Sequence, residues 1–452
     1  MSINFDLDSN YLLNGDCFKV IPELKDDSLD LVLTDFPYGI SFMGKAWDNC
    51  EEGFFEKVGK VLFPKMKAGS FLVTTFTPRM DMLWRCLSEL EKAGFEMKTS
   101  PMFWLYHTGF PKAGDMSKQI DKQKGLTGKI INPKTYPDIR SNNYGNSQGT
   151  TRLSGGDYIA ENEESKAWSG FKSFQLKPSV EVVICVQKPR TEKTIVGQVL
   201  ANGCGSVNIE KCRIPYSSES DISVSPQKDT SSWHGNSWSK NPQINNGEVK
   251  EFTGRFPANL LVSGEPLKGY SKSGTLKGVY GGFGNSSICY GDSEKANANY
   301  SKNEGSPNRF YSLDAWWEKR NITLTEESAF FDVPKPSKAE KNKGCEVKDY
   351  KSKRPSGVLY NKEEPDGFRD TLKQNSHPTT KPIKLFTYLT ELFSKKGDTV
   401  LDCFMGSGTT GIACSVLGRK FIGIEKEKDY FEIARARIRE QQKQSKIWGE
   451  FK

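Results

Sequence analysis

A glycine-rich segment has the residue types and spacing of a nucleotide-binding loop. Residues 406–411 read GSGTTG, which fits the pattern G-x-G-x-x-G and lies between a predicted strand and a predicted helix. Glycines let the backbone approach a ligand closely, and the first turn of a helix favours negative charge. Glu425 ends the next predicted strand, where a carboxylate can accept hydrogen bonds from ribose hydroxyls. The segment therefore predicts a site for an adenosine-containing cofactor.

A second candidate site is the stretch TDFPYG, residues 34–39, which directly follows the apolar run 29–33. Pro-Tyr-Gly after a strand is also the ordinary composition of a turn. Taken alone, the stretch leaves a turn and a ligand pocket both open, and the rest of the chain has to decide between them.

The cofactor is not expected to be a dinucleotide. A nicotinamide-binding fold needs a second mononucleotide-binding half, but after Glu425 only one predicted helix and a short tail remain. No second phosphate loop is visible in the N-terminal part of the sequence. Phe404 stands just before the glycines, where an aromatic ring can cover a flat or cationic ligand. A sulfonium nucleoside fits this combination better.

Both ends of the chain alternate between predicted strands and helices, which is typical of an α/β fold. Apolar runs predict strands at 11–13, 29–34, 69–76, 95–106, 179–189, 398–404 and 420–425. Helices are predicted at 53–66, 78–94, 381–397, 406–418 and 428–442. We therefore expect a doubly wound, mostly parallel, Rossmann-like sheet.

The middle of the chain loses this alternation and becomes rich in Gly, Ser, Asn and Tyr. A structureless loop from 190 to 375 would be abnormal within a compact domain. We interpret it as an inserted domain with elements of its own, predicted at 254–262 and 314–320.

The composition favours a globular protein, because 36% of the 452 residues are hydrophobic and 27% are charged. No apolar run approaches the roughly 18 residues of a membrane span, and residues 1–10 lack the features of a signal peptide. We expect a soluble, cytoplasmic protein with no membrane partner. The net charge of +8 permits a polyanionic partner without requiring one.

Neither the cysteines nor the histidines indicate a metal site. The 10 cysteines include no Cys-x-x-Cys pair, and several lie within apolar runs, so buried reduced thiols are expected. The three histidines, His107, His234 and His377, are not near a second candidate ligand. We predict no metal.

The motifs TDFPYG, HPTTKP and LDCFMGSGTTG, in this order, resemble those of the S-adenosylmethionine-dependent DNA amino-methyltransferases. The order matches the permuted beta group of that family, with the catalytic motif first and the cofactor loop last. The segment LKPSVEVVICVQKPR, residues 176–190, resembles phage and prophage members. The stretches RFPANLLV, RFYSLDAWWEKR and PSKAEKNKGC extend the resemblance over most of the chain.

The resemblance implies a circularly permuted methyltransferase sheet with a large inserted target-recognition domain. Its parts would be 1–106, the catalytic half; 107–178, a loop-rich insertion; 179–189, a returning strand; 190–375, the target-recognition region and linker; and 376–452, the cofactor-binding half. Ligands of a doubly wound sheet bind at the carboxyl ends of its strands, whatever order the chain visits them in. Asp35 and Phe404 are therefore expected to face one crevice.

The implied reaction transfers a methyl group from S-adenosylmethionine to an amine of a base that has left duplex DNA. The catalytic tetrapeptide would be Asp35, Phe36, Pro37 and Tyr38. The Asp35 carboxylate and the Phe36 carbonyl would accept the hydrogens of the amine, and Tyr38 would stack on the base. The cofactor would be held by Asp402, Phe404, Gly406 and Gly408 on its methionine side, Glu425 at the ribose, Asp16 near the adenine, and His377, Thr379 and Lys381 near the carboxylate.

Several alternatives stay open. Asp16 could be a turn residue that caps the helix after it, and Lys381 could lie at a solvated helix start. The family usually has Pro where Phe36 stands, and losing that ring loses rigidity, so a non-catalytic DNA-binding relative remains an alternative. Asp35 favours adenine N6 as the target, with cytosine N4 as the alternative, and methylation of RNA or of a protein amide is a third reading.

The resemblance also suggests a role in restriction and modification. The target-recognition region would read base edges with Arg, Lys, Asn and Gln. Its aromatic residues could stack on bases or belong to the core, and we favour the core for Trp233, Trp238, Trp316 and Trp317. The sequence leaves a monomer and a homodimer both open, and it does not give the target sequence.

Overall fold

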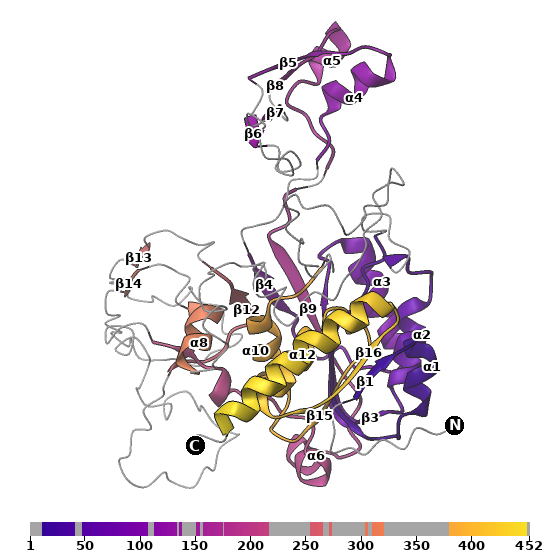
Figure 1. The fold of residues 1–452 in the computed structure, drawn as a ribbon, viewed down its shortest axis with the longest axis vertical. Coiled ribbons are helices and arrows are strands. Elements are labelled where there is room, and N and C mark those ends of the chain that lie inside the picture. Colours follow the sequence, from indigo (N-terminus) through magenta and orange to yellow (C-terminus); the bar gives the residue numbers. More distant parts are fainter. Residues whose placement is uncertain are drawn as a thin grey trace, which may run out of the picture. The chain divides into compact units, whose positions relative to one another are not determined.

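The structure is a computed structural model of the chain (Figure 1). It describes residues 11–40, 48–106, 113–132, 135–137, 151–153, 157–174, 176–216, 254–264, 271–273, 303–305, 310–320 and 379–449. By its contacts the chain divides into two units, one of residues 1–107 and 180–452, and the other of residues 108–179.

The first unit contains an eight-stranded sheet with the strand order β1-β16-β15-β2-β3-β9-β4-β12. All neighbouring strands are parallel except β9, which is antiparallel to β3 and to β4. The strands are β1 (Tyr11–Asn14), β2 (Leu29–Asp35), β3 (Met66–Phe76), β4 (Met102–Leu105), β9 (Val180–Gln187), β12 (Leu260–Val262), β15 (Thr399–Asp402) and β16 (Lys420–Glu425). The predicted α/β class with a mostly parallel sheet is confirmed.

The two ends of the chain interleave in this sheet. The C-terminal strands β15 and β16 lie between β1 and β2, and Val400 and Leu401 of β15 are in register with Leu31 and Val32 of β2. The carboxyl ends of β2 and β15 therefore meet at the same edge of the sheet, although they are far apart in the sequence.

Both faces of the sheet are buried, because its central strands are apolar on both sides. Leu31 and Leu33 of β2 belong to one hydrophobic cluster, and Val32 between them belongs to the other. The first cluster includes residues of α8 (Leu313–Lys319), α10 (Ile383–Phe393), α11 (Thr409–Leu417) and α12 (Lys428–Gly449). The second includes residues of α1 (Cys17–Val20), α2 (Phe54–Leu62) and α3 (Met80–Lys92). Helices thus cover each face, as a doubly wound fold requires.

The described parts of 190–375 belong to the same unit as the main sheet. β12 pairs in parallel with β4, and Trp316 and Trp317 of α8 are buried in the first cluster, as expected for core residues. The other elements here are α6 (Ile195–Asn202), β10 (Ile214–Pro215), β11 (Gly254–Arg255), β13 (Ser271–Ser273) and β14 (Asn303–Gly305). Trp233 and Trp238 lie outside the described residues. The assignment of target recognition to this region stays a prediction.

The second unit, which includes most of the loop-rich insertion expected at 107–178, contains short helices and strands. Its elements are α4 (Met116–Gln123), α5 (Glu163–Ala167), β5 (Lys129–Ile131), β6 (Thr135–Pro137), β7 (Thr151–Leu153) and β8 (Asp157–Ile159). Asp115 caps α4 by accepting the N–H of Lys118, and Asn162 caps α5 by accepting that of Ser165. Both helices are short and largely polar, so they lack the apolar periodicity that predicts a helix.

β4 is shorter than the predicted strand 95–106. Pro101 has no N–H to donate to a neighbouring strand, and regular pairing begins only after it, at Met102. Before it, Glu96 forms an isolated bridge with Gln187.

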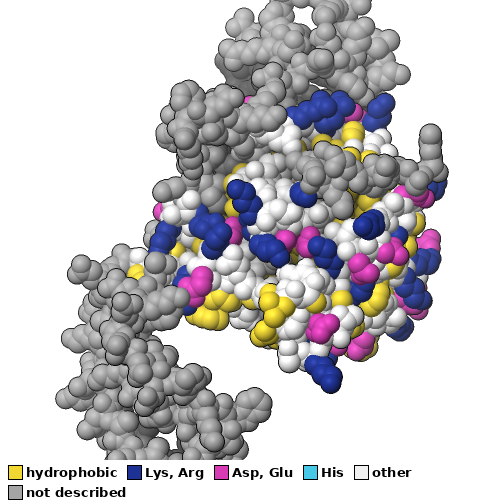
Figure 2. All heavy atoms as spheres, turned by 90° about the horizontal axis from the view of Figure 1, so that it is seen from below, with side chains coloured by type: hydrophobic (Ala, Val, Ile, Leu, Met, Phe, Trp, Pro, Cys, Tyr) yellow, Lys and Arg dark blue, Asp and Glu magenta, His cyan; other side chains and the backbone are white. Residues whose placement is uncertain are grey.

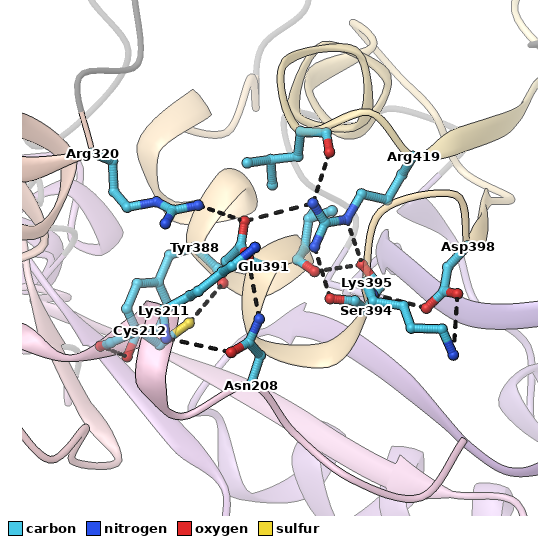
Figure 3. Close-up of polar contacts among 12 residues, drawn as sticks. Asn208, Lys211, Cys212, Arg320, Tyr388, Glu391, Ser394, Lys395, Asp398 and Arg419 are labelled. Carbon is cyan, nitrogen blue, oxygen red and sulfur yellow. Dashed lines mark hydrogen bonds and ion pairs between the residues drawn. The ribbon is translucent and has the colours of Figure 1, made fainter. Parts of the chain in front are cut away.

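A buried carboxylate, Glu391 of α10, joins three segments of the first unit (Figure 3). Its Oε2 accepts from Arg320 Nη2 at 3.0 Å and lies 3.5 Å from Arg419 Nη1. Its Oε1 accepts from Asn208 Nδ2 at 3.2 Å and lies 3.6 Å from Lys211 Nζ. The side chain of Glu391 is only 1% exposed, so these partners compensate a charge removed from water.

All eight cysteines within the described residues are buried free thiols: Cys17, Cys50, Cys86, Cys185, Cys204, Cys212, Cys403 and Cys414. Burial raises the pKa of Cys50 and of Cys185 to about 12. These thiols are therefore packing groups rather than reactive thiolates.

Figure 2 shows one face, on which the basic and acidic side chains of the described residues are interspersed. None of the described helices is both long and apolar enough to span a bilayer.

Candidate active site

The two candidate motifs lie side by side at the carboxyl ends of β2 and β15. Thr34, the residue before Asp35, donates its hydroxyl to Asp402 Oδ1 at 2.6 Å. The rings of Phe36 and Phe404, which follow the two strands, meet edge to face with centroids 5.7 Å apart. The structure thus brings TDFPYG and the glycine-rich loop to one place, and a simple surface turn does not describe residues 34–39.

Asp35 ends β2 and is surrounded by donors. Its Oδ1 accepts from Thr75 Oγ1 at 2.5 Å and lies 3.4 Å from the hydroxyl of Tyr38. Its Oδ2 forms an ion pair with Lys381 Nζ. Thr75 is the residue paired with Asp35 on β3. The sequence analysis missed Thr75, because only strand pairing relates it to Asp35.

Phe36 is held in place by packing and by one hydrogen bond. Its ring is 1% exposed and lies 5.9 Å from Phe55 and 5.7 Å from Phe404, measured between centroids. Its N–H donates to Thr74 Oγ1 at 3.0 Å. A proline at this position could not make that bond. The backbone of the tetrapeptide is therefore fixed without the proline that the family usually has.

The turn after Phe36 is shaped around Gly39 and Asp48. The ring of Tyr38 packs against Phe76 with centroids 5.3 Å apart, and the carbonyl of Pro37 lies 3.6 Å from Cys50 Sγ. Gly39 has φ +67°, and a Cβ there would lie 2.6 Å from Met82. Buried Asp48, which the sequence analysis missed, accepts the N–H of Gly39 at 2.9 Å.

Lys381 lies beside Asp35 and Tyr38. Besides its ion pair with Asp35, its Nζ lies 3.9 Å from Glu181 Oε2 and 5.4 Å from the centroid of the Tyr38 ring. Glu181, on β9, also accepts from the hydroxyl of Tyr38 at 3.1 Å. Lys381 is 8% exposed, so the alternative of a solvated helix start is wrong. Its predicted contact with the cofactor carboxylate stays a prediction.

The glycine-rich loop begins with a bond to the carboxylate of Glu425. Gly406, at φ +52°, donates its N–H to Glu425 Oε2 at 2.7 Å, and Glu427 donates to Oε1 at 2.8 Å. Burial raises the pKa of Glu425 to about 7, although these two N–H groups lower it. The carboxyl group therefore changes its charge near neutral pH.

Two glycines of the motif are also required by the packing around them. Gly408 has φ +82°, and a Cβ there would lie 3.0 Å from Ala434. A Cβ on Gly411 would lie 2.4 Å from Ile438 and 2.7 Å from Phe421. Close packing of α11 against α12 and β16 therefore requires these glycines, independently of a ligand.

Asp402 lies beneath the loop with its oxygens engaged inside the protein. Oδ1 accepts from Thr34 and from the N–H of Phe404, the latter at 3.1 Å, and Oδ2 accepts from Thr410 Oγ1 at 2.5 Å. Burial raises the pKa of Asp402 to about 6. Asp402 thus connects β2, β15 and α11, and its predicted place near the methionine side of the cofactor stays a prediction.

Thr380 and Lys381 of the HPTTKP segment contact the loop. Ser407 Oγ donates to Thr380 Oγ1 at 3.2 Å, and Thr409 Oγ1 donates to the carbonyl of Lys381 at 3.2 Å. Thr379 is half-buried, and His377 lies outside the described residues. On the other side of the loop, buried Arg437 of α12 donates to the carbonyl of Ser407 at 2.6 Å. Sequence reasoning missed Arg437, because an arginine in an amphipathic helix gives no signal of its own.

Asp16 caps the short helix α1, since its Oδ1 accepts the N–H of Phe18 at 3.0 Å. This was the alternative to a cofactor role, and the geometry allows both. The N–H of the preceding Gly15 donates to the carbonyl of Glu425 at 2.9 Å, so Asp16 follows β1 at the same sheet edge as Glu425. Its predicted place near the adenine stays a prediction.

These residues fit a nucleoside cofactor. The loop supplies backbone at positive φ before α11, the ring of Phe404 is half-buried beside it, and the Glu425 carboxylate ends the next strand. Among the described residues, no group of three His, Cys, Asp or Glu side chains is placed to hold a metal ion.

Comparison with known proteins matches part of the chain to DNA methylases. Residues 286–436 match the family N6_N4_Mtase, described as DNA methylase. A stretch of 62 residues is 52% identical to the type II methyltransferase M2.DpnII of Streptococcus pneumoniae. It is 48% identical over 62 residues to M2.LlaDCHI of Lactococcus lactis subsp. cremoris. Each match covers 14% of this chain and 23% of the relative.

Solved structures align with a larger share of the chain, but at lower sequence identity and with low TM-scores. TTHA0409 of Thermus thermophilus, titled a DNA modification methylase, is 14% identical with a TM-score of 0.37 and covers 95% of this chain and 94% of its own. PvuII DNA methyltransferase, titled cytosine-N4-specific, is 13% identical with a TM-score of 0.40 and covers 97% and 93%. Residues 286–436 are therefore similar to the N6_N4_Mtase family of DNA methylases, and the chain spans 23% of the length of the two curated relatives that it matches.

Proposed function

We propose that the protein transfers a methyl group from S-adenosylmethionine to the N6 amine of adenine in a short sequence of duplex DNA. The observation that carries the proposal is the meeting of Asp35 with the glycine-rich loop at the ends of the neighbouring strands β2 and β15. A base pocket and a cofactor loop at one sheet edge are what in-line transfer between the two ligands requires.

The tetrapeptide supplies the acceptors for the amine. An exocyclic amine is a poor nucleophile because its lone pair is delocalised into the ring. The Asp35 carboxylate and the Phe36 carbonyl would accept its two hydrogens and favour a more tetrahedral nitrogen. Thr75 and Thr74 preset these groups by bonding Asp35 and the N–H of Phe36. Preorganised acceptors of this kind do not have to reorient during the reaction.

The cofactor, when bound, supplies an electrophilic methyl group on a sulfonium centre. The backbone of Gly406 and Gly408, the ring of Phe404 and the carboxylate of Glu425 would hold it, with Asp16, Asp402, Thr379, Lys381 and His377 as further proposed contacts. Tyr38 would stack on the target base after that base leaves the duplex.

Asp35 in the first position of the motif favours adenine N6, and cytosine N4 is the alternative target. The rival idea of a non-catalytic relative rested on Phe36, and it loses support because Thr74 and the aromatic packing fix that residue. Recognition of DNA by residues 190–375, service in a restriction-modification system and a phage-like origin are parts of the proposal that follow from the resemblance.

The proposal is tested by incubating the purified full chain with methyl-labelled S-adenosylmethionine and DNA from a host without base methylation. Label should enter DNA and co-chromatograph with N6-methyladenine after digestion to nucleosides. Asp35→Ala should reduce transfer by roughly a hundredfold or more, since a preorganised contact to the reacting group is lost. Cofactor affinity, measured by calorimetry, should change little.

Label in N4-methylcytosine would mean that the target base is cytosine rather than adenine. The assignment of the site residues would not change. No label in DNA from the folded wild-type protein contradicts the proposed function. Loss of cofactor binding together with transfer in Asp35→Ala would show that Asp35 has been given the wrong role.

A further inference from the structure

Four ionisable or hydroxyl side chains from separate parts of the chain meet in the proposed base pocket. Asp35 ends β2, Tyr38 follows it, Glu181 lies on β9 and Lys381 precedes α10. The hydroxyl of Tyr38 lies 3.4 Å from Asp35 Oδ1 and donates to Glu181 Oε2 at 3.1 Å. No motif points to Glu181.

Lys381 makes both of the contacts that the target base would need. Its ammonium group donates to Asp35 Oδ2. This oxygen belongs to the carboxylate that would accept a hydrogen bond from the amine of the base. It also lies 5.4 Å from the centroid of Tyr38, within the range of a cation–π contact with the ring that would stack on the base. Lys381 and a flipped base therefore compete for the same two partners.

Lys381 cannot release Asp35 simply by losing its charge. Burial lowers the pKa of Lys381, but the carboxylates of Asp35 and Glu181 raise it, and the pKa lies above its ordinary value. A charged group that is 8% exposed needs another carboxylate if it leaves the first, because an unpaired buried charge is strongly unfavourable. Glu181 Oε2 lies 3.9 Å from the same nitrogen and can provide that partner.

We propose that Lys381 closes the empty base pocket by pairing with Asp35, and that it exchanges Asp35 for Glu181 when the target base enters. Glu181 is then a positioning residue, which receives the ammonium group and keeps its contact with Tyr38. This inference rests on the proposed function, because it needs a base that enters the pocket. It adds a condition for entry of the base: Lys381 must first move from Asp35 to Glu181. This exchange replaces one ion pair by another, so no buried charge is left without a partner.

The test is a double-mutant cycle of Glu181→Gln and Lys381→Met in the full chain. The substrate is an unmethylated duplex that carries the sequence recognised by the wild-type protein. A 2-aminopurine at the target position reports base flipping by its fluorescence, independently of turnover. Glu181→Gln removes the second carboxylate but keeps an acceptor for Tyr38. It should lower the flipping signal and raise KM for DNA by about tenfold, because fewer molecules have an open pocket. The change in kcat should be smaller.

In the Lys381→Met background the pocket has no ammonium group to move. There, Glu181→Gln should change KM for DNA by less than about twofold, which is the non-additivity expected of coupled residues. Glu181→Asp should restore part of the flipping signal, since it restores a carboxylate. As a matched control, Glu96→Gln removes a carboxylate paired with Lys98 at 2.7 Å beside the other end of β9, and it should leave KM unchanged.

Equal effects of Glu181→Gln in both backgrounds would overturn the exchange, because Glu181 would then act on Tyr38 alone. Should Glu181→Gln fail to fold, Lys381→Met alone decides: a flipping signal at or above that of the wild type supports the inference, and a lower one overturns it. An additive cycle in a protein that methylates DNA refutes only this inference. A wild-type protein that transfers no methyl group to DNA refutes the proposed function itself.

Discussion

Phe36 illustrates how a residue that departs from a motif can be held in place by its surroundings. Its ring is buried between Phe55 and Phe404, and its N–H is bonded to Thr74. A proline would restrict φ by its own ring, whereas here the core and one hydrogen bond do so. The substitution thus exchanges covalent rigidity for packing, which is a change that a motif alone does not reveal.

The charge state of Glu425 predicts a pH dependence of cofactor affinity. Burial raises its pKa from 4.5 to about 7, so the carboxylate that would accept ribose hydroxyls is only partly present at neutral pH. Cofactor affinity should rise as the pH rises through about 7, by roughly fivefold between pH 6 and pH 7 for this group. Calorimetric titration of the wild type and of Glu425→Gln measures this, and the variant should lack that component of the pH dependence.

The stability of the cofactor-free chain should respond in the opposite sense. Because the pKa of Glu425 in the folded state lies above 4.5, protonated Glu425 favours the folded state. Its contribution to stability is present below pH 4.5 and is lost as the pH rises through about 7.

For the affinity measurement, the same pH profile in the wild type and in Glu425→Gln would contradict a cofactor contact through this carboxylate.

At the scale of elements, the cluster around Glu391 attaches α10 to the segments of Lys211, Arg320 and Arg419 (Figure 3). Glu391→Gln keeps the shape but leaves the buried guanidinium of Arg419 without its countercharge. The free energy of unfolding should fall by about 3–5 kcal/mol, as for other broken buried ion pairs. Denaturation in guanidinium chloride measures this change.

A matched control for Glu391→Gln is Glu432→Gln on α12. Glu432 pairs with Arg435, and both side chains are more than 40% exposed. The loss there should be at most about 1 kcal/mol, since exposed pairs contribute little. Equal small losses in the two variants would mean that Glu391 does not hold these segments together.

The strands and helices that carry the proposed site follow from local pattern. The apolar run 29–33 and the Gly-Ser-Gly stretch predict a strand end and a strand-to-helix loop, and β2, β15 and α11 are found there. The contacts of Asp35 with Thr75 and Lys381, and of Tyr38 with Glu181, could not be predicted, because they depend on which strands are neighbours. Local periodicity carries no information about strand order. Likewise, the short polar helix α4 has no apolar stripe to reveal it.

At the scale of the whole molecule, the interleaved ends of the chain form a single sheet. β16 and β15 from the C-terminal part lie between β1 and β2 from the N-terminal part. The proposed cofactor loop and base pocket are therefore complete only when both ends fold together. The described parts of the region between them attach to the same unit through β12, α8 and the Glu391 cluster.

We propose that this assembled site methylates adenine in a specific DNA sequence. The most direct measurement is to express the full chain in a host that lacks adenine methylation and to map modified bases in its genome by single-molecule sequencing. The account predicts N6-methyladenine at one enriched sequence motif, and none in cells that express Asp35→Ala. A genome without modified adenine or cytosine, in cells that contain the folded wild-type protein, would contradict it.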